Sequence, residues 1–194
     1  MTNNKQIKQL AINAVLITLV VVLAFIPIRI GIIEMTLTII PIAVGAIIAG
    51  PITGLILGTV FGLVSFIQCF GYSPFGYSLL TIDPFLTFLV CVPTRMIVGL
   101  VPGLISKFLF KKENLKIFGQ GLICVLVPIL NTVLFTSVLI ICFFNTAFIQ
   151  GLSSGLNPLP FAIAFVGLNG LVEILVGILA SFPIAKSLEK YLKR

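Results

Sequence analysis

Four polar side chains lie inside apolar stretches that are long enough to cross a membrane. Arg95 and Glu173 carry full charges, and Asn131 and Asn169 carry amides. An ionised group at such depth is costly unless it faces the protein interior, a partner group or a ligand. Arginine also has a planar fork of donors that can bind both oxygens of a carboxylate. These residues therefore predict a polar centre that accepts a charged solute.

The same residues also have a purely structural interpretation. Arg95 and Glu173 could form a buried ion pair that only specifies packing, and an asparagine in a membrane helix usually makes a helix–helix hydrogen bond. The two interpretations are compatible. Polar groups from three helices at one depth favour a pocket, which Gln68 and the aromatic segment around Tyr72 could close. An interfacial aromatic belt is the alternative for that segment.

The composition indicates the elements that must hold these side chains. Hydrophobic residues make up 59% of the 194-residue chain and charged residues only 9%, whereas soluble domains carry about 25% charged residues. A spanning helix needs about 20 apolar residues. We therefore predict an all-α membrane protein, a single domain of residues 1–194 that forms a six-helix bundle. The six helices are expected at about 9–27, 36–49, 52–70, 83–107, 117–143 and 159–185.

The distribution of positive charge predicts the orientation of this bundle. If the N-terminus is cytoplasmic, ten of the twelve Lys and Arg residues fall in cytoplasmic segments, and the outer loops hold only Arg29. Cytoplasmic loops of membrane proteins are enriched in Lys and Arg. Both termini are therefore expected in the cytoplasm. The net charge of +7 is explained by topology, and nucleic acid is not an expected partner.

Several kinds of chemistry are excluded. The chain has no histidine, so Ser-His and HExxH chemistry is absent. It has no P-loop for ATP and no carboxylates at metal-site spacing. The four cysteines form no CxxC pair and are interpreted as small buried hydrophobes. No catalytic residue, metal or cofactor is expected, and the chain is not expected to be an enzyme.

A stripe of glycines recurs every four residues at Gly50, Gly54, Gly58 and Gly62. This spacing places them on one helix face. Small residues allow close approach of another backbone in lipid. The stripe is expected to pack inside the bundle, with docking of a partner as the alternative.

Several stretches, taken in order and spacing, are similar to those of one family. They are MTLTIIPIAVGAIIAGPITGLILGTVFGL (35–63), SPFG (73–76), DPFLTFLVCVPTRMIVGLVPGLI (83–105), LNTVLF (130–135) and NGLVEIL (169–175). In these stretches the chain resembles the substrate-binding S components of energy-coupling factor (ECF) vitamin transporters. The resemblance covers essentially the whole chain.

This resemblance implies a subunit that captures a vitamin outside a bacterial plasma membrane. The vitamin would pass on through a transmembrane T subunit and two ATPase subunits. The stretches 35–63 and 83–105 are most similar to the pantothenate group, whose carboxylate Arg95 would suit. The family's docking stripe on the first helix is matched only in part, by Ala11 and Ala14. A stand-alone secondary carrier or channel, and a structural membrane subunit, remain as alternatives.

Overall fold

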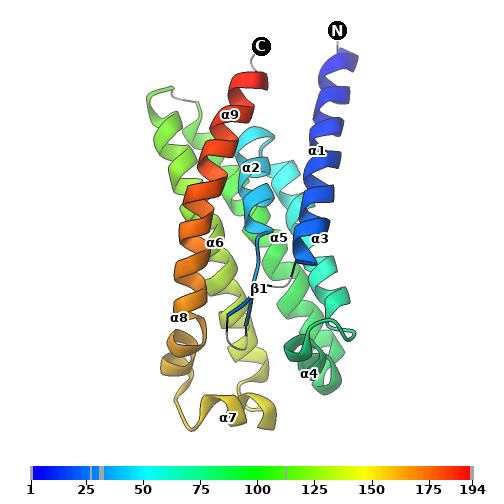
Figure 1. Cartoon of the computed structure of the whole chain (residues 1–194), viewed down its shortest axis with the longest axis vertical. Coiled ribbons are helices and arrows are strands. Elements are labelled where there is room, and N and C mark those ends of the chain that lie inside the picture. The colour runs from blue at the N-terminus through cyan, green and yellow to red at the C-terminus, as the bar shows by residue number, and fades with distance from the viewer. Residues whose placement is uncertain (1, 27, 31–32, 112, 193–194) are drawn as a thin grey trace.

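A computed structural model describes residues 2–26, 28–30, 33–111 and 113–192 as an elongated bundle of helices whose two termini lie at the same end (Figure 1). The elements in chain order are α1 (Thr2–Ala24), β1 (Ile28–Ile30), β2 (Ile33–Met35), α2 (Ile39–Ile48), α3 (Pro51–Gln68), α4 (Pro74–Ile82), α5 (Pro84–Leu109), α6 (Glu113–Phe143), α7 (Ala147–Ser153), α8 (Pro158–Val176), the π-helical turn η1 (Gly177–Ser181) and α9 (Phe182–Leu192).

Five helical stretches among the described residues are long and apolar enough to cross a membrane. They are Gln6–Ala24, Pro51–Gln68, Pro84–Leu109, Leu115–Phe143 and Gly170–Lys190, the last of which runs through α8, η1 and α9. The prediction of a helical membrane protein is thereby confirmed. A sixth apolar helix, α2, has only ten residues.

The short helix α2 lies inside the bundle. Eight of its ten residues are buried, and it contacts α1, α3, α5, α6, η1 and α9. A helix surrounded by other helices does not need to match the thickness of the hydrocarbon layer, because its ends are satisfied within the protein. This position explains how a segment shorter than a usual span is accommodated.

Two segments expected as loops contain short helices. Residues 71–81 contain α4 except for its last residue, and the N-cap Ser73 accepts a hydrogen bond from the backbone N–H of Gly76 at 3.3 Å. Residues 145–158 include α7, whose N-cap Thr146 accepts from Ile149 N at 3.4 Å. A capping hydroxyl satisfies one of the orphan donors of a first turn, so each of these short helices is stabilised by a local cap.

Other boundaries differ less from expectation. Asp83 Oδ1 caps α5 by accepting from Phe85 N and Leu86 N at 2.9 and 3.0 Å, as its position before Pro84 predicts. The expected loop at 28–35 contains an antiparallel two-stranded ribbon in which Arg29 is opposite Glu34. The helix predicted at 159–185 is interrupted by η1, which lies against α6.

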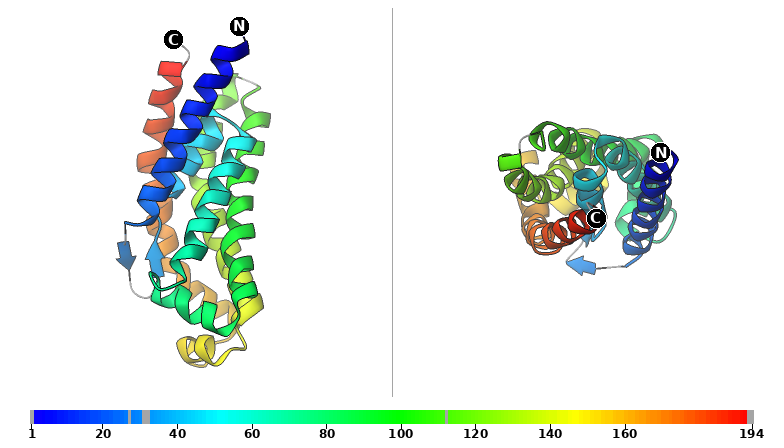
Figure 2. Two further views of the ribbon diagram at one scale, coloured as in Figure 1. Left: turned by 90° about the vertical axis from the view of Figure 1, so that its right-hand side faces the viewer. Right: turned by 90° about the horizontal axis from the view of Figure 1, so that it is seen from above.

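The glycine stripe packs inside the bundle, where α3 and α5 lie side by side (Figure 2). A Cβ added at Gly54 would overlap Gly99 O, and one at Gly58 would overlap Arg95 O. One at Gly62 would lie 2.8 Å from Val92 Cα. α5 covers these three glycines, as the packing interpretation expects. The alternative, in which they dock on a partner, is therefore corrected for Gly54, Gly58 and Gly62.

Gly50 differs from the rest of the stripe. Its φ of +81° is a conformation that favours glycine, and it forms the turn between α2 and α3. A Cβ there would have no neighbour within 4 Å. Gly50 is therefore explained by the turn.

Candidate functional site

A cavity of about 110 Å³ lies in the half of the bundle that holds α4, away from the two termini. A single water needs roughly 10–15 Å³ of such space, so the cavity has room for a small organic molecule. Its walls come from α1, α3, α4, α5, α6, α8 and the segment before α2. The lining residues are Ala24, Thr36, Phe61, Ser65, Gln68, Cys69, Ser73, Phe75, Gly76, Leu79, Cys91, Arg95, Asn131, Thr132, Phe135, Thr136 and Glu173.

Arg95 projects from α5 into this cavity and is only 7% exposed. Its Nη1 donates to Val90 O at 2.8 Å and to Thr94 Oγ1 at 3.3 Å. The guanidinium carbon lies 5.1 Å from the ring centre of Phe61 and 4.8 Å from that of Phe135. A cation over an aromatic face is stabilised by the ring quadrupole. The two rings and the two acceptors hold the fork in one orientation.

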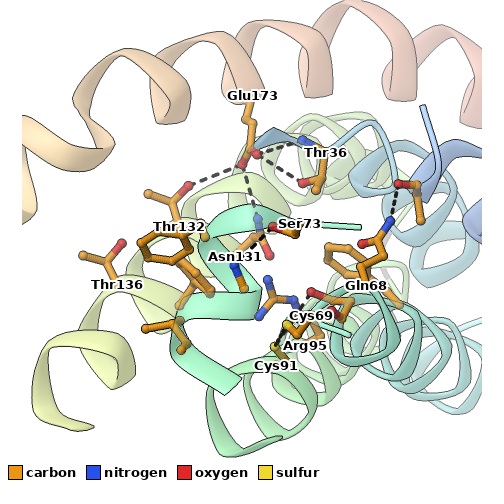
Figure 3. A pocket seen from close by; sticks show the side chains of 17 residues that line it. Thr36, Gln68, Cys69, Ser73, Cys91, Arg95, Asn131, Thr132, Thr136 and Glu173 are labelled. Carbon is orange, nitrogen blue, oxygen red and sulfur yellow. Dashed lines mark hydrogen bonds between the residues drawn. The ribbon is translucent and has the colours of Figure 1, made fainter. Parts of the chain in front are cut away.

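Glu173 enters from α8 and is held by three other polar residues (Figure 3). Oε1 accepts from Thr36 N at 3.3 Å and from Thr36 Oγ1 at 3.1 Å. Oε2 accepts from Asn131 Nδ2 at 3.3 Å and from Thr132 Oγ1 at 3.4 Å. The carboxylate therefore joins the segment before α2 to α6 and α8.

These contacts decide how the two charges are satisfied. Arg95 bonds to groups of its own helix and to aromatic rings, whereas Glu173 bonds to hydroxyl, amide and backbone donors. These contacts therefore do not form an ion pair between Arg95 and Glu173 that serves packing alone. The amide nitrogen of Asn131 is the donor to Glu173 Oε2. The Oδ1 of Asn131 is thereby left for another donor.

The described residues contain five buried side-chain polar atoms without a hydrogen-bond partner, and three of them belong to residues that line the cavity. These three are Arg95 Nε, a donor, Asn131 Oδ1, an acceptor, and Thr136 Oγ1, which can do either. The other two belong to Thr38 and Ser181. Most buried polar groups in proteins are paired, and each exception needs an explanation. A polar ligand in the cavity would explain these three.

The predicted binding residues separate into those that meet and those that do not. Arg95, Asn131, Glu173 and Gln68 all line the cavity, and Gln68 Nε2 also donates to the carbonyl of Ala24 at 2.7 Å. The side chain of Asn169 lies outside the described residues.

Tyr72 was expected at the site, but its side chain contacts the segment that follows α1. Its hydroxyl donates to Phe25 O at 2.8 Å, and the two rings pack edge to face at 5.5 Å. It is not among the described residues that line the cavity, and Phe75 of α4 supplies an aromatic wall there. The correction has a simple cause: once α4 forms, Phe75 turns inward and Tyr72 meets the end of α1.

Several lining residues were not singled out from the sequence. Most lie one helical turn from another lining residue, a spacing that places both on one face. The sets with this spacing are Phe61, Ser65 and Cys69; Phe75 and Leu79; Cys91 and Arg95; Asn131 and Phe135; and Thr132 and Thr136. Extending Arg95 and Asn131 by one turn would have found Cys91 and Phe135. Thr36 carries no such signal, because it lies outside a helix.

The family of ECF transporter substrate-specific components matches residues 8–185 of this chain. The chain therefore belongs to that family and is a substrate-binding subunit of an ECF importer, a multi-pass protein of the bacterial plasma membrane. The family is a class of transporters, not of enzymes. One similar protein is the pantothenic acid transporter PanT of Lactococcus lactis subsp. cremoris (strain MG1363), which is 31% identical over 166 residues. That match covers 80% of this chain and 78% of PanT.

Proposed function

We propose that this subunit captures pantothenate in the cavity and that Arg95 binds its carboxylate. The observation that carries this proposal is the set of three unpaired polar atoms on the cavity wall: Arg95 Nε, Asn131 Oδ1 and Thr136 Oγ1. The name of the similar protein PanT supports the choice of vitamin.

The chemistry of pantothenate matches these atoms. Its carboxylate is an acceptor for Arg95, whose charge-assisted bonds to carboxylates are among the stronger hydrogen bonds in proteins. Its amide N–H or a hydroxyl can donate to Asn131 Oδ1, and another hydroxyl can pair with Thr136 Oγ1. Its geminal methyl groups suit the phenyl rings of the cavity. Mostly apolar walls with a few polar groups are typical of small-molecule sites.

The proposed topology has six spans, with α2 as the second and with cytoplasmic termini. The described lysines support it, because they gather at the ends of helices that share the side of the termini (Figure 1). These ends belong to α1, α5, α6 and α9, and the residues are Lys8, Lys107, Lys111, Lys116, Lys186 and Lys190. In this orientation the cavity lies in the outer half of the bundle. The single domain of residues 1–194 is part of the same proposal.

The proposed partners are a transmembrane T subunit and two ATPase subunits. The first helix supports a docking role, because only 11% of its apolar window is buried within the chain. Ala11 and Ala14 are both exposed on it. Small exposed residues allow a second helix to approach closely in lipid. The expected result is that large side chains at these two positions weaken assembly and leave vitamin binding intact.

Equilibrium binding of a vitamin panel to the purified chain tests the proposed ligand. We expect pantothenate to bind below the micromolar range and Arg95→Ala to weaken it by roughly 10- to 150-fold, the value of one hydrogen bond to a charged group. Lys107→Ala is the matched control, because it removes one positive charge from an exposed position on the same helix. Unchanged affinity in Arg95→Ala, or tighter binding of another vitamin, would overturn the proposal. Transport by the reconstituted chain alone would instead indicate a secondary carrier.

A further inference from the structure

Two of the four cysteines lie next to each other in the wall of the cavity. Cys69 is the C-cap of α3 and Cys91 lies in α5, and their Sγ atoms are 3.9 Å apart. Both residues line the cavity (Figure 3) and are 4% exposed. The interpretation of all four cysteines as small buried hydrophobes does not explain why two thiols meet at a ligand site.

The contacts around the pair bring the two sulfurs close to each other. Cys69 Sγ donates to Ser65 O at 3.3 Å, and Ser65 Oγ lies 3.9 Å from Cys91 Sγ. Gly76 of α4 covers Cys69 so closely that an added Cβ would lie 2.6 Å from Cys69 Sγ. A larger residue at position 76 would push into the sulfur. The glycine therefore leaves the space that the dithiol occupies.

The two sulfurs are within reach of a covalent bond. A disulfide has an S–S length of about 2.05 Å, so the sulfurs must approach each other by roughly 2 Å. Cys69 ends α3 and is followed by a turn in which Gly71 has a φ of +135°. A side chain at a helix end can change rotamer and backbone more easily than one in the middle of a packed helix. Cys91, inside α5, supplies the fixed partner.

We propose that Cys69 and Cys91 form an oxidation site within the substrate cavity, where a peroxide converts the two thiols to a disulfide. One thiol attacks hydrogen peroxide, the O–O bond breaks, and a sulfenic acid and a water are formed. The second thiol then displaces the sulfenic oxygen as water, and the S–S bond forms. Two thiols and one peroxide therefore give one disulfide and two waters, and each sulfur is oxidised as the peroxide is reduced.

Redox chemistry fits the pair better than metal binding. Among the described residues no three His, Cys, Asp or Glu side chains gather as a metal site would require. The guanidinium of Arg95 also lies one turn from Cys91 on the same helix face, and its positive charge opposes a bound cation. A two-sulfur site beside a fixed cation is therefore assigned to oxidation.

The disulfide would change the cavity that the vitamin enters, and this part of the inference rests on the proposed function. The bond would tie the end of α3, and α4 packed on it, to α5 one turn before Arg95. In the proposed topology the cavity faces the extracellular side, where disulfides persist. We expect oxidation to lower pantothenate affinity at least about tenfold, and bound pantothenate to slow the oxidation by occupying the route of the peroxide.

Peroxide treatment of the purified full-length chain tests the oxidation itself. Intact mass should fall by two hydrogens, and peptide mapping should find Cys69 joined to Cys91. Dithiothreitol should restore both the mass and the binding. Cys69→Ala and Cys91→Ala should each prevent the mass change, and Cys124→Ala and Cys142→Ala are matched controls that should still undergo it.

The outcomes separate the two proposals. If peroxide forms no Cys69–Cys91 bond, or joins other cysteines, the oxidation site is refuted whatever the vitamin does. If the disulfide forms while pantothenate never bound the untreated chain, the oxidation site stands and the proposed ligand fails. If the disulfide forms and pantothenate binds equally well before and after, the link between oxidation and capture is refuted.

Discussion

The close packing of α3 against α5 is open to a sharp test at Gly99. This residue lies on α5 opposite the glycine stripe, and an added Cβ would overlap Gly54 O and lie 2.7 Å from Gly54 C. Because both neighbouring atoms are backbone, no side chain can turn aside. The substitution Gly99→Ala must therefore move the two helices apart.

The size of the effect follows from these distances. Carbon atoms in contact are ordinarily about 3.5–4.0 Å apart, so restoring the contact requires a separation of roughly 1 Å. Overpacking costs about 1–3 kcal/mol, and we take the upper end here because the neighbour is backbone. Alanine returns about 1 kcal/mol through its better helix propensity. The net loss of about 2 kcal/mol corresponds to a melting temperature lower by roughly 4–8 °C.

Thermal unfolding of the purified chain in detergent measures this shift. Gly121→Ala on α6 is the matched control, because an added Cβ there has no neighbour within 4 Å and should leave stability unchanged or slightly raised. Pantothenate affinity should also fall in Gly99→Ala, since Arg95 lies one turn away on α5. A Gly99→Ala protein that melts with the parent would refute the backbone contact. It would also reopen docking as the role of the stripe.

Three further substitutions probe the polar residues. Thr36→Val removes the hydroxyl bond to Glu173 and keeps the backbone bond, so unfolding in detergent should show a loss of about 1–3 kcal/mol, the range from a neutral hydrogen bond to one with a charged group; no loss would mean that the hydroxyl contributes nothing. Asn131→Leu removes both the donor to Glu173 and the proposed acceptor for the ligand, and calorimetry should show pantothenate affinity at least about tenfold lower. Tyr72→Phe removes the bond to Phe25 O and keeps the ring contact. The pantothenate affinity of this variant should match that of the parent, and a clear decrease would indicate that the Tyr72 hydroxyl contributes to the site.

The sequence predicts the spanning helices well because the cost of polar groups in lipid acts on each segment separately. The same locality explains the start of α5, where Asp83 and Pro84 are adjacent in the chain and form the cap by themselves. The same locality should also predict α4, which was expected as a loop although its N-cap Ser73 and the following Pro74 form the same kind of cap. The polar and aromatic composition of residues 71–81 favoured a loop, whereas the cap indicates a helix.

The arrangement of the site was only partly predictable. Depth along each helix was enough to bring Arg95, Asn131 and Glu173 together, because depth is counted along the chain. Which neighbour a side chain meets depends on how helices pair, and no single segment contains that information. For this reason the glycine stripe had two interpretations until α5 was placed against it, and Tyr72 was expected at the cavity.

The way Arg95 is held explains how a membrane-buried cation can serve capture as well as packing. The acceptors Val90 O and Thr94 Oγ1 engage Nη1, and the rings of Phe61 and Phe135 stabilise the charge without accepting a conventional hydrogen bond. The ring contacts fix the plane of the guanidinium and leave Nε buried without an acceptor. An unpaired buried donor costs about 1–3 kcal/mol, and an arriving carboxylate removes that cost. A solute without an acceptor at this point leaves the cost in place, so it gains none of the affinity that a carboxylate gains from Arg95 Nε.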